Sequence, residues 1–340
     1  EAIPITGTIV SGTYKEGTSE LNIKTFAHGM FEAVSDYPFL SSSANHIFDI
    51  SAGYSARSAL SATSGRVQQA KKINIYNQHA QVLVGYDITG SIQEFDRDGN
   101  IAAGGDKMRE VFFINFARLL TKDEIKKDSF RLRAYATASA IQDPDNNIRS
   151  HRETIGDYGA ATNFKVNSPA GEYGLLFSQS VEPKGVPVGH VYYQAGIAVI
   201  TASFFTGAFG DPEATDASVD PKALRRQVDD ILTGSTITQL ANGLRYTIDN
   251  IDFNNTTELN STIYFCRANT QDYNYSSNPT YLTGSKIRVK NDNPQQEPSA
   301  YITTVGLYSA DNELLAVAKL SEPLKKTPSN ELTLRVRLDY

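Results

Sequence analysis

Three strand-like runs close the chain: Tyr301-Ile-Thr-Thr-Val-Gly-Leu-Tyr308, Leu314-Leu-Ala-Val-Ala-Lys-Leu320 and Leu332-Thr-Leu-Arg-Val-Arg-Leu338. The third run alternates Leu or Val with Thr or Arg, which is the two-residue period of a strand with one dry face and one wet face. The polar turn Ser309-Ala-Asp-Asn312 joins the first two runs, because Asp and Asn side chains bond their own backbone in turns. We therefore expect a C-terminal β-meander that docks firmly, and none of its residues suggests catalysis.

The same segment carries a family resemblance. The run Thr304-Val-Gly-Leu-Tyr-Ser-Ala-Asp-Asn-Glu-Leu-Leu-Ala-Val-Ala-Lys-Leu320 resembles a strand pair in virion proteins of contractile-tailed phages. Upstream, Phe253-Asn-Asn-Thr-Thr-Glu-Leu-Asn-Ser-Thr-Ile-Tyr-Phe-Cys-Arg267 and Asn274-Tyr-Ser-Ser-Asn-Pro-Thr280 are similar to segments of large structural proteins of T-even-like phages of marine and cyanobacterial hosts. The resemblance covers the C-terminal half and, more loosely, residues 45–130. It implies a structural protein of the virion, in the tail, baseplate or neck, whose partners are other virion proteins.

Length and composition favour a β-rich protein with two compact units. A chain of 340 residues exceeds the size at which one core usually suffices. The 18 Tyr and 16 Phe, with no Trp, favour strands and wide subunit contacts over a helical bundle. The predicted fold is α+β and β-rich, with two antiparallel-sheet units, a few packed helices and an extended N-terminal arm.

Local patterns suggest the domain boundaries. Residues 1–25 are predicted to form an extended arm or a pair of short strands with Gly turns, and an arm would either reach a neighbouring subunit or fray as a free terminus. Residues 26–167 form a β-rich domain with helices. It includes a helix over 56–81, a buried apolar and aromatic strand over 109–120, and a short helix over 122–127 that Thr121 caps. Residues 168–340 form a second β-rich domain. It contains an amphipathic helix over 221–233, a strand over 246–253, a strand over 261–267 and the terminal meander.

Charge and cysteine content restrict the partners. The formal net charge is −6 and the basic residues occur as isolated pairs, so direct nucleic-acid binding is not expected. The most apolar window, residues 191–209, contains polar residues and two glycines, and we expect no membrane span. Cys266 is the only cysteine, which excludes an intrachain disulfide and suits assembly in a host cytoplasm.

No motif in the sequence predicts a metal, a cofactor or a catalytic residue. The five histidines have no two-ligand spacing, and there is no nucleophile elbow, Walker loop or dinucleotide-binding loop. Asp96-Arg-Asp-Gly-Asn100 begins like a calcium loop, but Ile101 and Lys107 stand where glycine and glutamate are needed, so a tight turn is predicted. His151-Arg-Glu153 and Asp157 can be imagined as the acid and base of a glycan-cleaving tail enzyme.

The sequence therefore predicts a non-enzymatic subunit that forms a homo-oligomer or ring and acts through its surfaces. The polar loop over 268–298 and exposed edge strands are the expected contact regions. The candidate contact residues are Ile5, Ile9, Tyr14, Tyr273, Tyr275, Tyr281, Tyr301 and Tyr308. Two alternatives remain, namely a fibre or receptor-binding subunit that contacts host glycans and a virion-associated glycan hydrolase.

Overall fold

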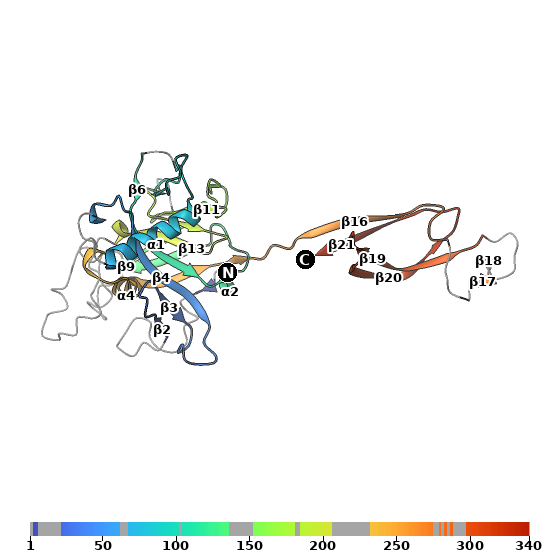
Figure 1. The fold of residues 1–340 in the computed structure, drawn as a ribbon, viewed down its shortest axis with the longest axis horizontal. Helices are drawn as coiled ribbons and strands as arrows, with labels where there is room; N and C mark the ends of the chain where they lie inside the picture. Colours follow the sequence, from blue (N-terminus) through green and yellow to red (C-terminus); the bar gives the residue numbers. More distant parts are fainter. Residues whose placement is uncertain are drawn as a thin grey trace. The chain divides into compact units, whose positions relative to one another are not determined.

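The computed structural model describes residues 3–5, 22–61, 67–101, 104–135, 152–180, 184–205, 232–274, 279, 282–283, 286–287 and 297–339. The fold is α+β and β-rich, with several antiparallel sheets and few helices, which confirms the predicted class (Figure 1). The chain divides into two compact units, Glu1–Thr257 and Glu258–Tyr340. We call them the sheet unit and the ribbon unit and describe each by itself.

The sheet unit is built on a seven-stranded antiparallel sheet with the order β11-β12-β13-β7-β4-β3-β2. In chain order its strands are β2 (Ile23–Thr25), β3 (Glu32–Ser35), β4 (His46–Tyr54), β7 (Glu110–Phe116), β11 (Tyr173–Leu176), β12 (Gly189–Tyr192) and β13 (Ile197–Thr201). Neighbouring strands all run antiparallel. Strands β4 and β7 pair along their length, from Phe48 opposite Phe116 to Tyr54 opposite Glu110.

The central strand β7 is covered on both faces. Phe112 and Ile114 enter the larger of two apolar cores, whereas Val111 and Phe113 enter the smaller one. Successive side chains of a strand point to opposite faces, so a run without polar alternation needs a cover on each side. The expectation from the sequence that this apolar and aromatic run is buried is confirmed.

Helix α1 (Val67–Leu83) covers one face of the seven-stranded sheet (Figure 1). Its buried residues recur at helical spacing and are Lys72, Ile75, Tyr76, Ala80 and Leu83. Gly53 of β4 permits the close approach, because a Cβ there would lie 2.7 Å from the Lys72 carbonyl oxygen and 2.9 Å from the Tyr76 nitrogen. The helix therefore packs directly onto the backbone of the strand.

A second layer shares the larger core on the opposite face. It contains a four-stranded antiparallel sheet with the order β1-β14-β9-β10, formed by β1 (Ile3–Pro4), β9 (Arg131–Tyr135), β10 (Arg152–Gly156) and β14 (Ile248–Phe253). Helix α4 (Ile237–Thr247) adds Leu240, Ala241 and Leu244 to the same core. The described part of the sheet unit is thus layered as helix, sheet, and sheet with helix.

Short elements complete the sheet unit. Strand β5 (Phe95–Asp96) pairs with β6 (Lys107–Met108), and β8 (Glu124–Ile125) pairs with β15 (Asn255–Thr256). A four-residue helix, α2 (Arg118–Thr121), and two 3₁₀ turns, η2 (Ala59–Ser61) and η4 (Ala202–Phe204), connect the strands. Among the described residues, no helix combines the length and the apolar character needed to cross a membrane.

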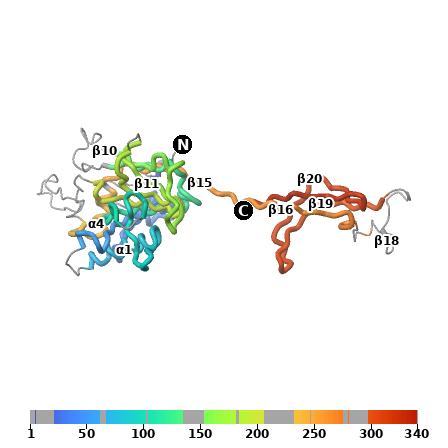
Figure 2. Tube along the Cα trace, turned by 90° about the horizontal axis from the view of Figure 1, so that it is seen from above, coloured from blue at the N-terminus to red at the C-terminus, as the bar shows by residue number. Residues whose placement is uncertain are grey.

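The ribbon unit consists of two-stranded antiparallel ribbons. Strand β16 (Ser261–Ala268) pairs with β21 (Leu332–Asp339), β19 (Ala300–Tyr308) with β20 (Leu314–Lys326), and β17 (Leu282–Thr283) with β18 (Lys286–Ile287). The β16–β21 ladder keeps one register, whereas the register of the β19–β20 ladder shifts at two places. Figures 1 and 2 show these two longer ribbons alongside each other within the unit.

The predicted domain boundaries need correction. The division lies between residues 257 and 258 and not near 167, because one sheet takes β2, β3, β4 and β7 from before residue 167 and β11, β12 and β13 from after it. The predicted extended arm over residues 1–25 is also wrong in its described parts, where the alternative of short strands is observed. Ile3–Pro4 pairs with β14, Ile5 is fully buried, and Ile23–Thr25 is an edge strand of the large sheet.

Several predicted elements differ as well. The expected helix over 122–127 is absent, since α2 ends at Thr121, Lys122 has a φ of 53° and Glu124–Ile125 is a strand. The run over 246–253 belongs to the sheet unit, where β14 begins at Ile248 after a helix that the sequence did not predict. The terminal runs are strands but form no meander, because β21 pairs with β16. Most of the predicted helix over 221–233 lies outside the described residues.

Candidate interaction surface

The ribbon unit exposes more apolar side chain than it buries. Of its described residues, four are buried, namely Ala268, Ala300, Lys326 and Thr327. Its large exposed apolar side chains are Leu259, Ile263, Tyr264, Phe265, Tyr273, Tyr301, Tyr308, Leu314, Leu315 and Val317. An isolated two-stranded ribbon is at best marginally stable in water, and two small buried alanines add little to it. The described part of this unit therefore lacks a core of ordinary size.

The β16–β21 ribbon has two distinct faces. Opposite residues of an antiparallel ladder share a face, so Tyr264 lies beside Val336 and Phe265 beside Arg335. The face that contains Val336 also contains Leu332, Leu334 and Leu338, and these four side chains are partly buried. On the other face Ile263 and Phe265 are 42% and 69% exposed. We call these the inner face and the outer face of the ribbon.

The β19–β20 ribbon repeats this pattern. Val305 and Leu307 pair with Ala318 and Ala316, and all four side chains are partly buried. On the opposite face Tyr308, Leu315 and Val317 are 62%, 68% and 54% exposed. A Cβ at Gly306 would lie 3.0 Å from the Tyr308 ring, so the ring covers the glycine. Each ribbon thus presents one exposed apolar face.

Lys326 ties the end of β20 to a loop after β16. Its ammonium group is fully buried and donates hydrogen bonds to the Thr270 carbonyl oxygen (3.1 Å), the Asn274 Oδ1 (2.9 Å) and the Thr327 carbonyl oxygen (2.9 Å). Three acceptors match the three donors of an ammonium group. The contact therefore fixes residues 270–274 against the turn that follows β20.

The structure separates the predicted contact residues into three groups. Tyr273, Tyr301 and Tyr308 are exposed in the ribbon unit, at 69%, 51% and 62%. Ile5 is a correction, because it is fully buried in the larger core and its N–H donates to the Ile251 carbonyl oxygen (2.8 Å). Ile9, Tyr14, Tyr275 and Tyr281 lie outside the described residues.

Sequence reasoning missed the exposed aliphatic and aromatic residues of the strands. Ile263, Phe265, Leu315 and Val317 are not among the predicted contact residues, although all four side chains are exposed. One signal was present in the sequence. Residues 262–266 and 314–318 are apolar or uncharged at every position, and a ribbon without covering elements must expose half of such a run.

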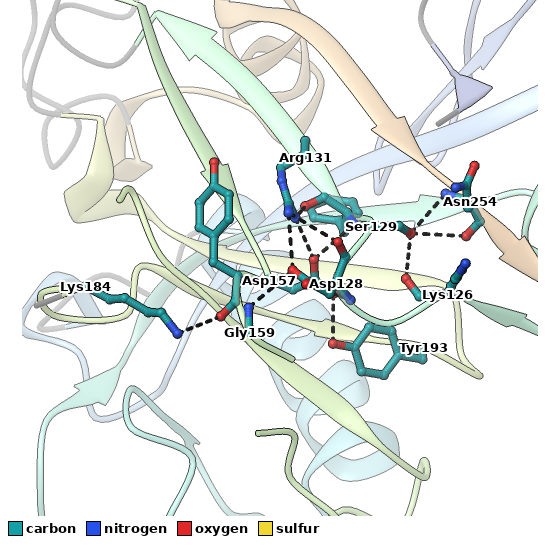
Figure 3. Close-up of polar contacts among 11 residues, drawn as sticks. Lys126, Asp128, Ser129, Arg131, Asp157, Gly159, Lys184, Tyr193 and Asn254 are labelled. Carbon is teal, nitrogen blue, oxygen red and sulfur yellow. Dashed lines mark hydrogen bonds and ion pairs between the residues drawn. The ribbon is translucent and has the colours of Figure 1, made fainter. Parts of the chain in front are cut away.

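The residues imagined as the acid and base of a hydrolase do not share one environment. Asp157 is fully buried, Glu153 is exposed, and His151 lies outside the described residues. The Asp157 carboxylate accepts hydrogen bonds from the Tyr193 hydroxyl (2.9 Å), the Arg131 guanidinium (2.9 Å) and the backbone N–H groups of Asp128 (2.7 Å) and Phe130 (3.0 Å). Figure 3 shows Arg131, Asp128 and Tyr193 around the Asp157 carboxylate.

This cluster, which we call the Asp157 cluster, has a structural role. Burial raises the pKa of Asp157, and the hydrogen bonds from Tyr193 and Asp128 together with the Arg131 charge oppose that shift. Arg131 also stacks on the Tyr158 ring, 4.1 Å from its centroid. All accepting positions of the carboxylate face protein donors, so it holds the ends of β9, β10 and β12 together.

A cavity of about 400 Å³ lies in the sheet unit, beside the β5–β6 hairpin. Its lining includes Arg57, Asp87, Ile92, Gln93, Glu94 and Arg109. Glu94 is buried and accepts from the Ser55 hydroxyl and from Arg109 Nε at 3.4 Å. The volume suits a small ligand, and the lining mixes planar polar groups with an aliphatic surface.

The described histidines are engaged in packing or hydrogen bonds. His79 stacks on Phe113 with ring centroids 3.9 Å apart, and burial lowers its pKa. Burial also lowers the pKa of His190 to about 4. The described residues contain no group of three His, Cys, Asp or Glu side chains that could hold a metal ion. Asp96-Arg-Asp-Gly-Asn100 is a turn, in which the Gly99 N–H donates to the Asp96 carbonyl oxygen (3.0 Å).

Comparisons with family models, curated proteins and solved structures find no match to this chain.

Proposed function

We propose that this chain is a non-enzymatic structural component of a contractile-tailed phage virion, in the tail, baseplate or neck. It acts by burying the ribbon unit against other polypeptides of the particle. The observation that carries the proposal is the surface of that unit, where ten large apolar side chains are exposed and two alanines are the only buried apolar residues described. Many exposed apolar side chains on a unit that buries few are typical of protein–protein contacts in soluble proteins.

The energetics favour a covered ribbon. Burying one large apolar side chain contributes about 1.5–3 kcal/mol when it passes from full exposure to full burial. Phe265, Leu315 and Val317 are more than half exposed, so covering them adds several such contributions to a unit that lacks a core. The two-stranded sheets also leave strand edges that can accept a further strand from another chain. Contact with a partner therefore stabilises the unit and joins subunits at the same time.

The resemblance of residues 304–320 to virion strand pairs supplies the setting for these contacts. In that setting the chain belongs to the virion, is assembled in the host cytoplasm, and has other virion proteins and copies of itself as partners. The proposal includes no catalytic step, no cofactor and no direct contact with nucleic acid.

Immunogold electron microscopy of the phage that encodes the chain tests this proposal. Antibodies raised against the sheet unit should label purified particles at the tail, baseplate or neck. Labelling that is absent from intact and partly disassembled particles, with the chain recovered only from the soluble lysate, would overturn the proposal. Antibodies against the major capsid protein provide the positive control for the particle fraction.

The cavity beside the β5–β6 hairpin favours one second candidate, a receptor-binding subunit. Carboxylate, amide and guanidinium groups next to Ile92 are the chemistry that binds sugar hydroxyl groups and the apolar side of a sugar ring. Binding of host surface glycans to the purified chain, lost in Gln93→Ala, would support this role. Absence of binding in a calorimetric titration would remove it.

A further inference from the structure

The cavity beside the β5–β6 hairpin is organised by one buried residue, Ser55, which directly follows β4. The Ser55 N–H donates to the Arg109 carbonyl oxygen (2.7 Å), and its hydroxyl oxygen accepts from the Arg57 N–H (3.1 Å). The same hydroxyl donates to the Glu94 carboxylate. Ser55 therefore places Arg57, Glu94 and Arg109, which all line the cavity, next to one another.

The two arginines of this lining have N–H donors without an acceptor. Among the described residues, the exposed Arg57 guanidinium has no hydrogen-bond or ion-pair partner. The Arg109 side chain is 44% exposed and donates from Nε to Glu94 at 3.4 Å, which leaves its two terminal amino groups for a ligand. Lys107, the third basic residue of the lining, is already paired with Asp96. Because a guanidinium carries five N–H donors in a planar fork that fits a carboxylate, Arg57 and Arg109 favour a ligand with a carboxylate group.

The acidic residues of the lining, Asp87 and Glu94, already accept hydrogen bonds from the protein. The Thr89 hydroxyl (2.6 Å) and the Ser91 N–H (2.9 Å) donate to Asp87 Oδ1, and these two bonds lower the pKa of Asp87. Glu94 accepts from Ser55 and from Arg109. Three basic side chains stand against two acidic ones in the lining, so its formal charge is positive. A ligand with one negative charge matches that excess.

A turn over residues 85–93 supplies an apolar side of the cavity. The Asp87 N–H closes this turn by donating to the Ser91 carbonyl oxygen (2.8 Å). Ile88 lies at the tip of the turn and is fully exposed, although it lines the cavity. The Gln93 side-chain amide also lines the cavity and makes no hydrogen bond in the described part of the chain. The turn therefore adds an apolar surface for a ring and an amide that can both donate to and accept from hydroxyl groups.

We propose that this cavity binds a sugar that carries a carboxylate, of which a uronic acid is the simplest. The sugar carboxylate binds Arg57 and Arg109 through charge-assisted hydrogen bonds. Its hydroxyl groups bond the Gln93 amide, and its ring lies against Ile88. The volume of about 400 Å³ lies in the range of small-molecule sites. The inference rests on the second candidate role, a receptor-binding subunit, and names its ligand class, whereas the structural role in the virion does not depend on it.

Saturation-transfer NMR titrations of the full chain with methyl glucuronide and methyl glucoside test the ligand class, because the two probes differ only in the carboxylate. The glucuronide should bind at least about tenfold more tightly than the glucoside, as expected for charge-assisted hydrogen bonds. Inorganic phosphate, added at constant ionic strength, should not displace the glucuronide, since phosphate has no ring to lie against Ile88. Equal binding of the two sugars, no binding of the glucuronide, or its displacement by phosphate would overturn the proposal.

The variant Arg57→Gln tests the placement of the carboxylate. It should weaken glucuronide binding at least about tenfold and leave glucoside binding unchanged, so that the preference between the two sugars is lost. Arg335→Gln removes the same charge from an exposed strand residue of the ribbon unit and should leave both affinities unchanged. Equal weakening by the two variants would overturn the proposal.

The outcomes separate this inference from the proposed roles. Equal binding of glucuronide and glucoside would keep the receptor-binding role and reject the inference. Binding of neither sugar by a chain that gold labelling places in the tail would reject both and preserve the structural role.

Discussion

In the described part of the chain two lysines are fully buried, and in both the ammonium group donates to backbone carbonyl oxygens. Lys72 contacts the carbonyl oxygens of Leu232 (2.5 Å) and Ser235 (2.6 Å), and Lys326 contacts those of Thr270 and Thr327. The buried Asp157 likewise receives two backbone N–H groups. Buried charges are tolerated when hydrogen bonds replace the lost water. At the residue scale these groups connect segments that are distant in sequence.

Asp157→Asn should destabilise the sheet unit by about 2–4 kcal/mol, because an amide cannot accept from the four donors that surround the carboxylate. Urea unfolding followed by fluorescence measures the change. Glu153→Gln is the control, since Glu153 is exposed and should give less than about 0.5 kcal/mol. Equal stability of wild-type and Asp157→Asn chains, combined with loss of cell-wall clearing, would instead support the hydrolase alternative.

Lys72 predicts a pH dependence of stability. Burial lowers its pKa from 10.5 to about 8, so near pH 9 the unfolded chain binds more protons at this site than the folded chain. The free energy of unfolding should therefore rise with pH from roughly 8 to 9.5, below the titration of exposed tyrosines. Thermal unfolding at several pH values measures this slope. Lys72→Met should abolish the slope, and a slope that persists in this variant would contradict the assignment.

Lys326→Met should destabilise the ribbon unit, because three acceptors on Thr270, Asn274 and Thr327 lose their donor. We expect a loss of about 2–3 kcal/mol, typical of unsatisfied buried polar groups. Lys325→Met is the matched control, since the neighbouring lysine is exposed. Hydrogen exchange of residues 269–274 measures the effect, and equal exchange in the two variants would show that the Lys326 contacts contribute nothing.

At the scale of elements, the sequence predicted strands correctly where the pattern of apolar residues within one strand shows which of its faces are buried. The apolar run of β7 and the alternation of β21 predicted strands, and both are observed. Helix α4 was not predicted, although the residues at its N-terminus form a capping sequence. Thr236 Oγ1 accepts from the Gln239 N–H (3.2 Å), and Gln239 Oε1 accepts from the Thr236 N–H (2.8 Å), which is a capping box. Thr121 has the same spacing to Glu124 yet ends a helix. Caps thus indicate a helix only together with a following apolar face.

The packing of α1 on β4 yields a prediction for the element scale. Gly53→Ala should destabilise the sheet unit by about 1–3 kcal/mol, because the new Cβ meets backbone atoms of α1 that cannot move away individually. Gly234→Ala is the control, since a Cβ there meets nothing within 4 Å. Chemical denaturation measures both variants. An equal effect of the two substitutions would show that helix and strand separate without cost.

At the scale of the whole molecule, the pairing of strands and the boundary between the units could not be predicted from the sequence. The partner of β21 is β16, which lies more than sixty residues earlier, and the large sheet joins strands from before and after residue 167. Such pairings depend on long-range complementarity, which periodicity does not encode. The exposed tyrosines at 273, 301 and 308 were predictable from composition, whereas Ile263 and Phe265 required the ribbon geometry.

The central claim is that the ribbon unit becomes stable when another polypeptide covers it. Hydrogen exchange of β16 and β20, measured by mass spectrometry over a range of protein concentrations, tests this claim most directly. The β7 strand provides the internal reference, because its protection should not depend on concentration. The account predicts fast exchange of both ribbons in dilute solution and increasing protection as the concentration rises. Protection of the ribbons equal to that of β7 at the lowest concentration would contradict it.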